Sequence, residues 1–371
     1  MTEQSEISGS GRRRVRGFGI VGAGVISATH ADAIASLPGA RLAAVTDVEP
    51  DRAKTFAARH DCAAEPDLDA LLARDDIDVV SVCVPSGLHA EAGMRAAAAG
   101  KHLIVEKPID VSLAAADRLI AATRAAGVVM TVISQHRFDQ GLIELRRLLD
   151  DGQLGRLVLG EASTKWYRSQ AYYDSGAWRG TWAFDGGSLM NQGIHYLDLL
   201  LWSMGPVIEV SALYSTETHQ MEAEDAALAV LRFASGAVGT VVASTAVYPG
   251  FAQRLEISGT GGTVVIEDGE IIRCELSADH ADPGLRGSLT ARGGSASAAT
   301  ANPAGLGVDS HAAQIGDFLD ALDEGRAPAV TAEDGRAALQ VVCAVYESAR
   351  DGRAVRLSAA SAMPGNAPGS S

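Results

Sequence analysis

The first part of the chain alternates short apolar runs with stretches of helical periodicity. Five apolar runs predict buried strands, over residues 16–24, 41–50, 78–86, 102–108 and 128–136. Helices are expected between them, over 26–37, 51–60, 67–77, 88–100 and 112–127. Strands that are apolar throughout and alternate with helices are typical of a parallel sheet covered on both faces. The pattern therefore predicts an α/β domain.

The rhythm changes after about residue 140. One helix is expected over 141–152, and longer strand-like runs follow over 157–167, 207–217, 226–247 and 253–276. Glycine turns within 233–241 and 258–265 predict hairpins, and therefore a mostly antiparallel sheet in a second, α+β domain. Two closing helices are expected over 312–325 and 334–352. We predict domains at 15–137 and 138–357, a mobile loop at 280–306, and disordered tails at 1–14 and 358–371.

One apolar helix, expected over residues 185–202, carries a stripe of polar residues. Asn191 and His195 are four residues apart and Asp198 follows three later, so all three project from about the same helix face. Gly186 and Gly187 open the segment and allow a sharp bend with a close backbone approach. A satisfied buried network is one explanation. A wall of a ligand site is the other.

Composition excludes several classes of protein. The 371 residues are 47% hydrophobic, which suits about two globular domains, and the net charge of −15 has the wrong sign for binding a nucleic acid backbone. The four cysteines are far apart and form no C-x-x-C pair, so we expect neither a metal site nor a disulfide framework. Apolar runs are too short to span a membrane. We expect a cytoplasmic protein.

A glycine motif joins the first strand to the first helix. In Gly22-x-Gly24-x-x-Ser27, the glycines allow a tight turn and bring a pyrophosphate close to the helix N-terminus, where Val25 and Ile26 follow. The second strand ends at Asp47, placed to bind a ribose diol and to repel a 2′-phosphate. The motif predicts a Rossmann domain that binds NAD in preference to NADP. An ordinary glycine turn is the alternative.

A lysine stands at the carboxyl end of the fourth strand, in the sequence Glu106-Lys107-Pro108. Ligands of parallel sheets bind at that edge, so Lys107 is a candidate active-site residue. Partial burial near other cations would lower its pKa. A surface lysine is the alternative.

Together these segments resemble the Gfo/Idh/MocA family of oxidoreductases, named for glucose-fructose oxidoreductase and inositol dehydrogenase. The resemblance is carried by Gly22-x-Gly24, by CVPSGLH (83–89), by EKP (106–108) and by GGSLMNQGIHYLDLL (186–200), and it extends from about Val15 to Leu357. It implies an N-terminal Rossmann domain, a C-terminal domain with a large open sheet, a nicotinamide in the cleft between them, and a homodimer or homotetramer.

The resemblance also implies roles for individual residues. Lys107 would contact substrate and cofactor and take part in proton transfer, and His195 would be a general acid or base; the sequence does not decide which is the main base. A cis peptide bond often precedes the residue that matches Pro108. The remaining cofactor contacts would come from Pro85, Ser86, His89, Glu106, Trp178 and Arg179.

Asn191 departs from the pattern, because many dehydrogenases of the family have Asp there. Asn can still hydrogen-bond a substrate hydroxyl, and an Asn191→Asp change would add a charge that raises the pKa of His195. Asp198, one turn deeper, is expected to be structural. Residues 168–182 with NQGIH resemble the branch that contains UDP-N-acetylglucosaminuronate 3-dehydrogenase.

The sequence therefore predicts an NAD-dependent dehydrogenase that interconverts a secondary alcohol and a ketone on a sugar, a sugar-acid derivative or a cyclitol. Two alternatives remain. One is a glycosidase-like enzyme that transfers hydride only transiently, and the other is a non-catalytic NAD-binding regulator.

Overall fold

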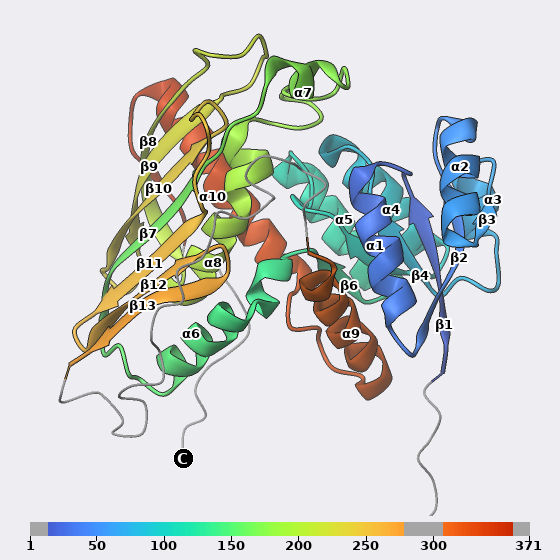
Figure 1. Cartoon of the computed structure of the whole chain (residues 1–371), viewed down its shortest axis with the longest axis horizontal. Coiled ribbons are helices and arrows are strands. Elements are labelled where there is room, and N and C mark those ends of the chain that lie inside the picture. Colours follow the sequence, from blue (N-terminus) through green and yellow to red (C-terminus); the bar gives the residue numbers. More distant parts are fainter. Residues whose placement is uncertain (1–13, 278–306, 359–371) are drawn as a thin grey trace, which may run out of the picture.

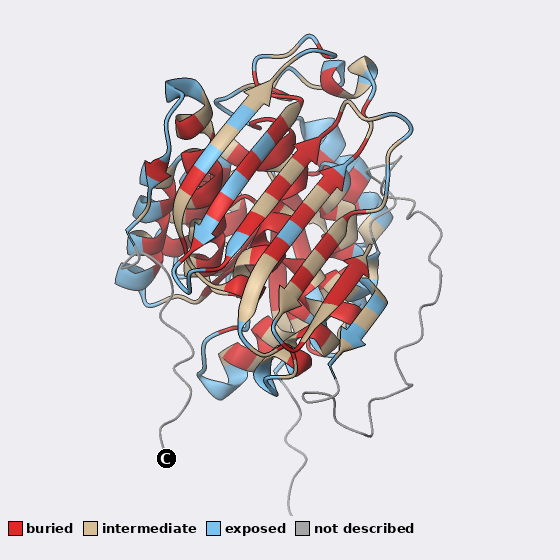
Figure 2. Cartoon of the chain, turned by 90° about the vertical axis from the view of Figure 1, so that its left-hand side faces the viewer, coloured by how far each residue is buried: buried red, intermediate tan, exposed pale blue. Residues whose placement is uncertain are grey.

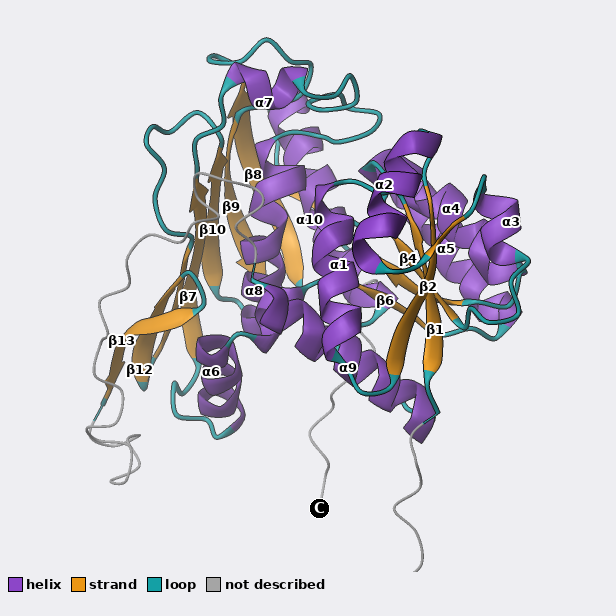
Figure 3. Cartoon of the chain, turned by 45° about the vertical axis from the view of Figure 1, so that its right-hand side comes forward, coloured by secondary structure: helices purple, strands orange, loops and turns teal. Residues whose placement is uncertain are grey.

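The computed structural model describes residues 14–277 and 307–358. The predicted loop at 280–306, nearly all of the N-terminal tail and all but Ser358 of the C-terminal tail lie outside the described residues. Two sheets, each accompanied by helices, lie side by side, with α8 and α10 between them (Figures 1 and 3). This arrangement confirms the predicted fold class, an α/β domain followed by an α+β domain.

The first sheet has six parallel strands in the order β3-β2-β1-β4-β5-β6. Its strands are β1 (Arg16–Val21), β2 (Ala40–Thr46), β3 (Ala63–Ala64), β4 (Val79–Val82), β5 (His102–Val105) and β6 (Met130–Val132). Its helices are α1 (Val25–Ser36), α2 (Pro50–His60), α3 (Leu68–Leu72), α4 (His89–Ala98) and α5 (Leu113–Ala126). The strand order reverses between β1 and β4, which creates the crevice where doubly wound sheets bind ligands.

The second sheet has eight strands in the order β13-β12-β11-β7-β10-β9-β8-β14. They are β7 (Leu157–Lys165), β8 (Val207–Ser215), β9 (Ala226–Phe233), β10 (Val238–Ser244), β11 (Arg254–Gly259), β12 (Gly262–Glu267), β13 (Glu270–Leu276) and β14 (Val355–Arg356). The predicted hairpins are present as β9–β10 and β11–β12, and only the β7–β10 pair is parallel.

One face of this sheet is covered and the other is open. Helices α6 (Gln140–Asp150), α8 (Ile194–Met204) and α10 (Ala332–Asp351) lie on the inner side, toward the first sheet (Figure 1). On β9, burial alternates strictly: Ala229 and Leu231 are buried, whereas Leu228 and Val230 point outward. Figure 2 shows the outer face with its alternating exposed positions.

The C-terminal part of the chain also completes the first domain. Helix α9 (Val308–Glu324) packs against α1, and its Ile315 and Phe318 share an apolar cluster with Phe18 of β1 and Ile34 of α1. The predicted boundary between 137 and 138 falls inside a short 3₁₀ turn at Gln135–Phe138 and stays a prediction. The two domains therefore share helices near the cleft.

Candidate active site

The glycine turn after β1 has two glycines with different requirements. Gly22 has a φ of +95°, and a Cβ there would lie 2.5 Å from the carbonyl oxygen of Cys83. At Gly24, a Cβ would meet no described atom within 4 Å, so its side is open. Gly22 is therefore required by the fold itself, whereas Gly24 leaves the space that a close-lying ligand would fill.

Helix α1 begins directly at this open side. Its N-cap residue is Gly24, which has no side chain to bond the first backbone N–H groups of the helix. These groups therefore remain available to an anion. Ser27, in the third motif position, is buried and its hydroxyl donates to the Gly24 carbonyl at 2.7 Å. Val25 and Ile26 form the first turn. This geometry fits the pyrophosphate of a dinucleotide.

Asp47 follows β2, as the sequence predicts. One of its carboxylate oxygens accepts the N–H of Ala23 in the glycine turn at 2.8 Å, and the other accepts the N–H of Glu49 at 2.8 Å. Arg52, which the sequence analysis missed, approaches the same carboxylate at 3.4 Å. Asp47 therefore ties the end of β2 to the turn where a dinucleotide would lie.

His89 joins the loop after β4 to the turn that carries Lys107. It is buried, and its ring nitrogens lie 2.7 Å from the Pro108 carbonyl oxygen and 2.9 Å from that of Val84. Burial lowers the pKa of His89, although the two carbonyl oxygens, which can only accept hydrogen bonds, and the charges of Glu106 and Asp110 oppose the shift. The Lys107–Pro108 peptide bond is cis, as the resemblance implied. Pro85 and Ser86 begin the 3₁₀ turn Ser86–Leu88 that leads into α4.

Glu106 lies in a buried polar cluster behind Lys107. His30 of α1 bonds Glu106 at 2.8 Å through one ring nitrogen and Ser81 at 2.6 Å through the other. His311 of α9 lies 3.9 Å from the same Glu106 oxygen. Burial, the largest single effect, favours the neutral acid, but the hydrogen bond from His30 and the charges of His30, His311 and Lys107 together outweigh it and lower the pKa of Glu106 to about 2. Helices from both ends of the chain thus meet at the carboxyl edge of β5.

We expected no metal site, and the cluster of His30, Glu106 and His311 is one group that the sequence analysis did not anticipate. Their ligand atoms lie within 4.8 Å of one another. The direct bond between His30 and Glu106 accounts for the arrangement of two of the three side chains. The sequence gave no sign of this cluster, because its members come from distant segments: α1, the residue after β5, and α9.

Lys107 reaches across to the second domain. Its Nζ donates to the backbone oxygen of Asn191 at 2.7 Å and lies 3.3 Å from the Asn191 side-chain oxygen. The Asn191 amide nitrogen donates in turn to Asp185. Burial lowers the pKa of Lys107, although the charges of Glu106 and Asp185 oppose the shift. The lysine is therefore closer to giving up its proton than a surface lysine.

The helix that carries Asn191 starts later than predicted and is not a regular α-helix. It opens with a π-helical turn over Leu189–Gly193, and α8 continues from Ile194. Periodicity analysis missed this wider turn because it assumes 3.6 residues per turn. Single π turns occur mostly inside α-helices and often at functional sites.

Glu224 anchors the start of this helix. It is fully buried, and its carboxylate accepts the Leu189 N–H at 2.7 Å and the Tyr346 hydroxyl at 3.2 Å. A Cβ on Gly187 would lie 1.4 Å from the other Glu224 oxygen. The close backbone approach expected of the glycine pair is thus an approach to Glu224, and Gly186 supplies the bend with a φ of +74°.

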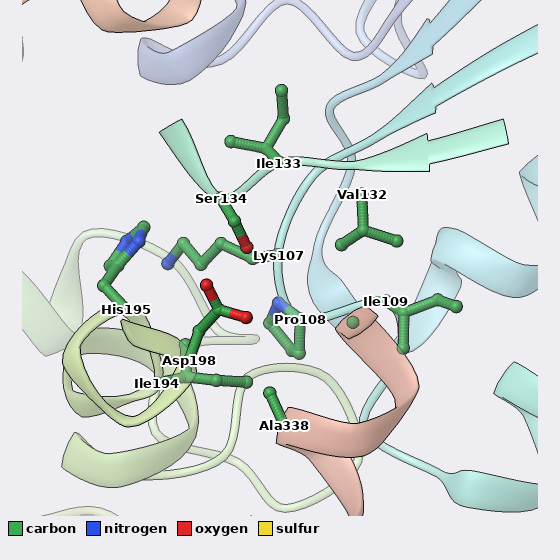
Figure 4. A pocket seen from close by; sticks show the side chains of 11 residues that line it. Lys107, Pro108, Ile109, Val132, Ile133, Ser134, Ile194, His195, Asp198 and Ala338 are labelled. Atoms are coloured by element: carbon green, nitrogen blue, oxygen red, sulfur yellow. The ribbon is translucent and has the colours of Figure 1, made fainter. Parts of the chain in front are cut away.

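His195 lines a small cavity between the two domains (Figure 4). Burial lowers the pKa of His195 well below its ordinary value, and the charges of Lys107 and His136 add to the shift, so the ring is neutral near pH 7. The edge of the His136 ring meets His195, with centroids 5.2 Å apart. The lining residues are Lys107, Pro108, Ile109, Val132, Ile133, Ser134, Ile194, His195, Asp198, Gly335 and Ala338.

Asp198 contributes to the wall of this cavity but is held by an arginine. Its two oxygens accept from Arg137 at 2.8 and 2.6 Å, and Arg137 also lies 3.3 Å from Asp334 of α10. All three side chains are buried. This arrangement agrees with the structural role expected of Asp198, and it ties α8 to α10.

Trp178 and Arg179 lie in the loop that precedes the polar helix, away from the lining of the small cavity. The Arg179 guanidinium donates to the Tyr172 hydroxyl at 2.7 Å and stacks 4.4 Å from the Trp178 ring centroid. The Tyr172 hydroxyl also accepts a hydrogen bond from the Gln192 side-chain amide at 3.5 Å. Arg179 is near enough to Lys107 to lower the pKa of that lysine. The sequence analysis missed Tyr172 and Gln192, since neither belongs to a motif.

The glycine turn, the open helix terminus and the lysine at the sheet edge define a nicotinamide-dependent oxidoreductase. Family comparisons agree. Residues 16–134 match the model described as "Oxidoreductase family, NAD-binding Rossmann fold", and residues 142–265 match the GFO/IDH/MocA C-terminal domain. The chain belongs to the GFO/IDH/MocA family of oxidoreductases and is an NAD-dependent enzyme.

Three similar proteins illustrate the range of the family. The WlbA dehydrogenase of Bordetella pertussis, solved with NADH and UDP-GlcNAcA, is 30% identical, with 93% of this chain and 98% of that chain covered and a TM-score of 0.84. Myo-inositol 2-dehydrogenase of Thermotoga maritima is 28% identical over 92% of this chain and 98% of the relative. The 2,7-anhydro-N-acetylneuraminate hydratase of Mediterraneibacter gnavus is 31% identical over 56% of this chain and 54% of the relative.

Proposed function

We propose that this enzyme oxidises a secondary alcohol of a sugar, a sugar-acid derivative or a cyclitol to a ketone, and catalyses the reverse reaction. The observation that carries the proposal is the convergence of Lys107 and His195, from the two domains, on one cavity. The similarity to a UDP-GlcNAcA-binding dehydrogenase and to an inositol dehydrogenase supports the substrate class.

The two side chains divide the proton chemistry. The glycine turn and Asp47 would hold NAD, which would supply the hydride acceptor for the carbinol carbon. The hydroxyl proton passes to Lys107, whose lowered pKa makes the free amine accessible. His195, neutral because it is buried, can donate or accept a hydrogen bond at the same hydroxyl without adding charge. In reduction, the Lys107 ammonium returns the proton.

The other predicted contacts follow from their positions. Asn191 would bind a substrate hydroxyl next to the reacting one, while Gly22, Gly24, Val25, Ile26 and Asp47 would hold the pyrophosphate and the adenosine ribose. Pro85, Ser86, His89 and Glu106 would lie on the nicotinamide side, and Trp178 and Arg179 would approach the carboxamide.

Absorbance of NADH on a panel of sugars, sugar acids, inositols and nucleotide sugars tests the proposal. Substrate-dependent NADH formation on at least one member supports it. Absence of turnover on every member, with NAD bound normally, favours a non-catalytic NAD-binding regulator instead.

A second candidate is an enzyme in which hydride is transferred and then returned, so that elimination or hydration is the net reaction. The similarity to a hydratase favours keeping this candidate. Product that forms with catalytic amounts of NAD and no accumulation of NADH would identify it.

We also propose that the protein forms a homodimer or homotetramer in the cytoplasm through the open face of the second sheet. Leu213, Leu228, Val230 and Val238 are 73%, 53%, 58% and 41% exposed there. Arg232 and Glu209 lie on the same face as these apolar residues. A two-fold interface would place the Arg232 of one copy within reach of the Glu209 of another. The four cysteines are all free, as expected in a reducing compartment.

Light scattering of the protein and of a Leu228→Arg variant tests the oligomer. A dimer or tetramer that dissociates in the variant supports this interface. We expect neither a nucleic acid partner nor a membrane partner. Among the described helices, none combines the length and apolar character needed to cross a bilayer.

A further inference from the structure

Asp185 is a buried acid that none of the motifs in the chain accounts for. It lies just before the glycine pair and is 1% exposed. One of its oxygens accepts the Gly180 N–H at 2.8 Å, and the other accepts the side-chain amide of Asn191. Burial raises the pKa of Asp185, whereas Gly180 and Asn191 act in the opposite direction. The charges of Arg179 and Lys107 lower the pKa as well, so all four groups favour the carboxylate.

This contact fixes which way the Asn191 amide points. An amide has a donor end with two N–H groups and an acceptor end, and one N–H of the donor end is bonded to Asp185. Its oxygen consequently faces Lys107, where it lies 3.3 Å from Nζ beside the backbone oxygen at 2.7 Å. A reversed amide would place an NH₂ group against an ammonium and a carbonyl oxygen against a carboxylate.

We propose that Asp185 is a positioning residue, which acts through the Asn191 amide to hold the Lys107 amine in the cleft and to place a negative charge one side chain away from it. The inference rests on the proposed function, since it assigns Asp185 to the same proton-transfer group.

The electrostatics of the surroundings agree with this role. Lys107 is faced by the negative charges of Glu106 and Asp185 and by the positive charges of Arg179 and Arg168. His195, from the same helix as Asn191, is neutral. Of the two acids, Glu106 is engaged by His30 from behind, whereas Asp185 is linked to Lys107 through Asn191.

The arrangement bears on the expected effect of Asn191→Asp. The new carboxylate would lie directly against buried Asp185. Two such carboxylates cannot both stay ionised. The added charge would be lost to a shared proton instead of raising the pKa of His195.

A reciprocal exchange tests the proposal. We expect Asp185→Asn and Asn191→Asp each to lower kcat/KM by roughly five- to 150-fold, the effect of one lost hydrogen bond in a dry site. The double variant Asp185→Asn/Asn191→Asp restores one amide and one carboxylate in contact, so it should recover to within about fivefold of the parent. Asp174→Asn, at an exposed acid bonded to Gln170, is the matched control.

A second readout does not need the substrate. The fraction of Lys107 that reacts with acetic anhydride, followed by peptide mass spectrometry across pH, reports the titration of its amine. Asp185→Asn should move this midpoint to lower pH, because a neighbouring negative charge is lost, and the double variant should move it back up. NAD affinity and melting temperature of each variant report whether the fold is intact.

The outcomes are distinguishable. If no panel substrate is oxidised but the Lys107 midpoint shifts as stated, the positioning role stands and the proposed function fails. If the midpoint stays unchanged in Asp185→Asn, or if the double variant is as impaired as the two single losses combined, Asp185 has a structural role only and the inference is wrong.

Discussion

Lys107 and Asn191 come from different domains, yet the lysine Nζ lies 2.7 Å from the backbone oxygen of Asn191 and 3.3 Å from its side-chain oxygen. Lys107 follows a strand of the Rossmann sheet, and Asn191 lies in the π-helical turn before α8. The contact makes the position of the lysine depend on the second domain, where the substrate would bind.

The two glycines of the dinucleotide turn should respond differently to Ala. Gly24→Ala should weaken NAD binding by about tenfold, because its Cβ enters open space needed by the pyrophosphate, with a loss of stability of no more than about 1 kcal/mol. Gly22→Ala should instead lower stability by about 1–3 kcal/mol, since the residue has a φ of +95° and no room for a Cβ. Melting temperature and NAD titration separate the two effects; equal NAD affinity in Gly24→Ala would contradict the site.

Asp47 should set the preference for NAD over NADP. Its carboxylate is held at the end of β2, so the 2′-phosphate of NADP would meet a negative charge. This repulsion should cost NADP about 1–3 kcal/mol of binding free energy relative to NAD. Asp47→Ala should narrow the preference, and Asp51→Ala, at an exposed acid in the next helix, should leave it unchanged. Titration of both cofactors measures the ratio. Tighter binding of NADP by the parent protein would remove Asp47 from this role.

The pH dependence of oxidation should report Lys107. Burial lowers the pKa of the lysine, and its free amine is the form that accepts the proton, so kcat/KM for oxidation should rise with pH through that lowered pKa and then level off. The pKa of His195 lies well below its ordinary value of 6.5, so His195 adds no rising or falling limb to the pH–rate profile above pH 6.5. His195→Gln should therefore keep the limb at a reduced rate. A limb that vanishes in His195→Gln but persists in Lys107→Ala would reverse the two roles.

Glu224 should make stability depend on pH. Burial raises the pKa of Glu224 to about 7, above the value expected in the unfolded chain. The stability that this group contributes is therefore full at low pH and is lost as pH rises through 7. From pH 5 to pH 8, the unfolding free energy of Glu224→Gln should therefore rise by about 2–3 kcal/mol relative to that of the parent. Melting curves at both pH values test this, with the exposed Glu222→Gln as control; a difference independent of pH would show that Glu224 is ionised in the folded protein.

Much of the fold follows from local pattern. Apolar runs between helical stretches located the parallel strands, and glycine turns located the β9–β10 and β11–β12 hairpins. Lys107 was found because a residue after a parallel strand must lie at the ligand-binding edge. These predictions succeeded because strand ends and turns are set by a few neighbouring residues.

Some missed features depend on local bends and others on contacts between distant segments. Asp185 stands six residues before Asn191, and only the bend at Gly186 and the π turn bring their side chains together. His136 follows the last parallel strand, so the argument used for Lys107 would also have selected it. His311 reaches Glu106 only because α9 returns to pack on α1, which no periodicity in the sequence reveals.

The measurement that tests the account most directly is NADH formation by the parent protein and by Lys107→Ala on the most active member of the substrate panel. We predict substrate-dependent NADH in equal amount to ketone product, and a fall in turnover of at least about 10²-fold in Lys107→Ala with NAD affinity and melting temperature retained. Lys54→Ala, at an exposed lysine, should match the parent. Full NADH formation by folded Lys107→Ala, or product without NADH in the parent, would contradict the account.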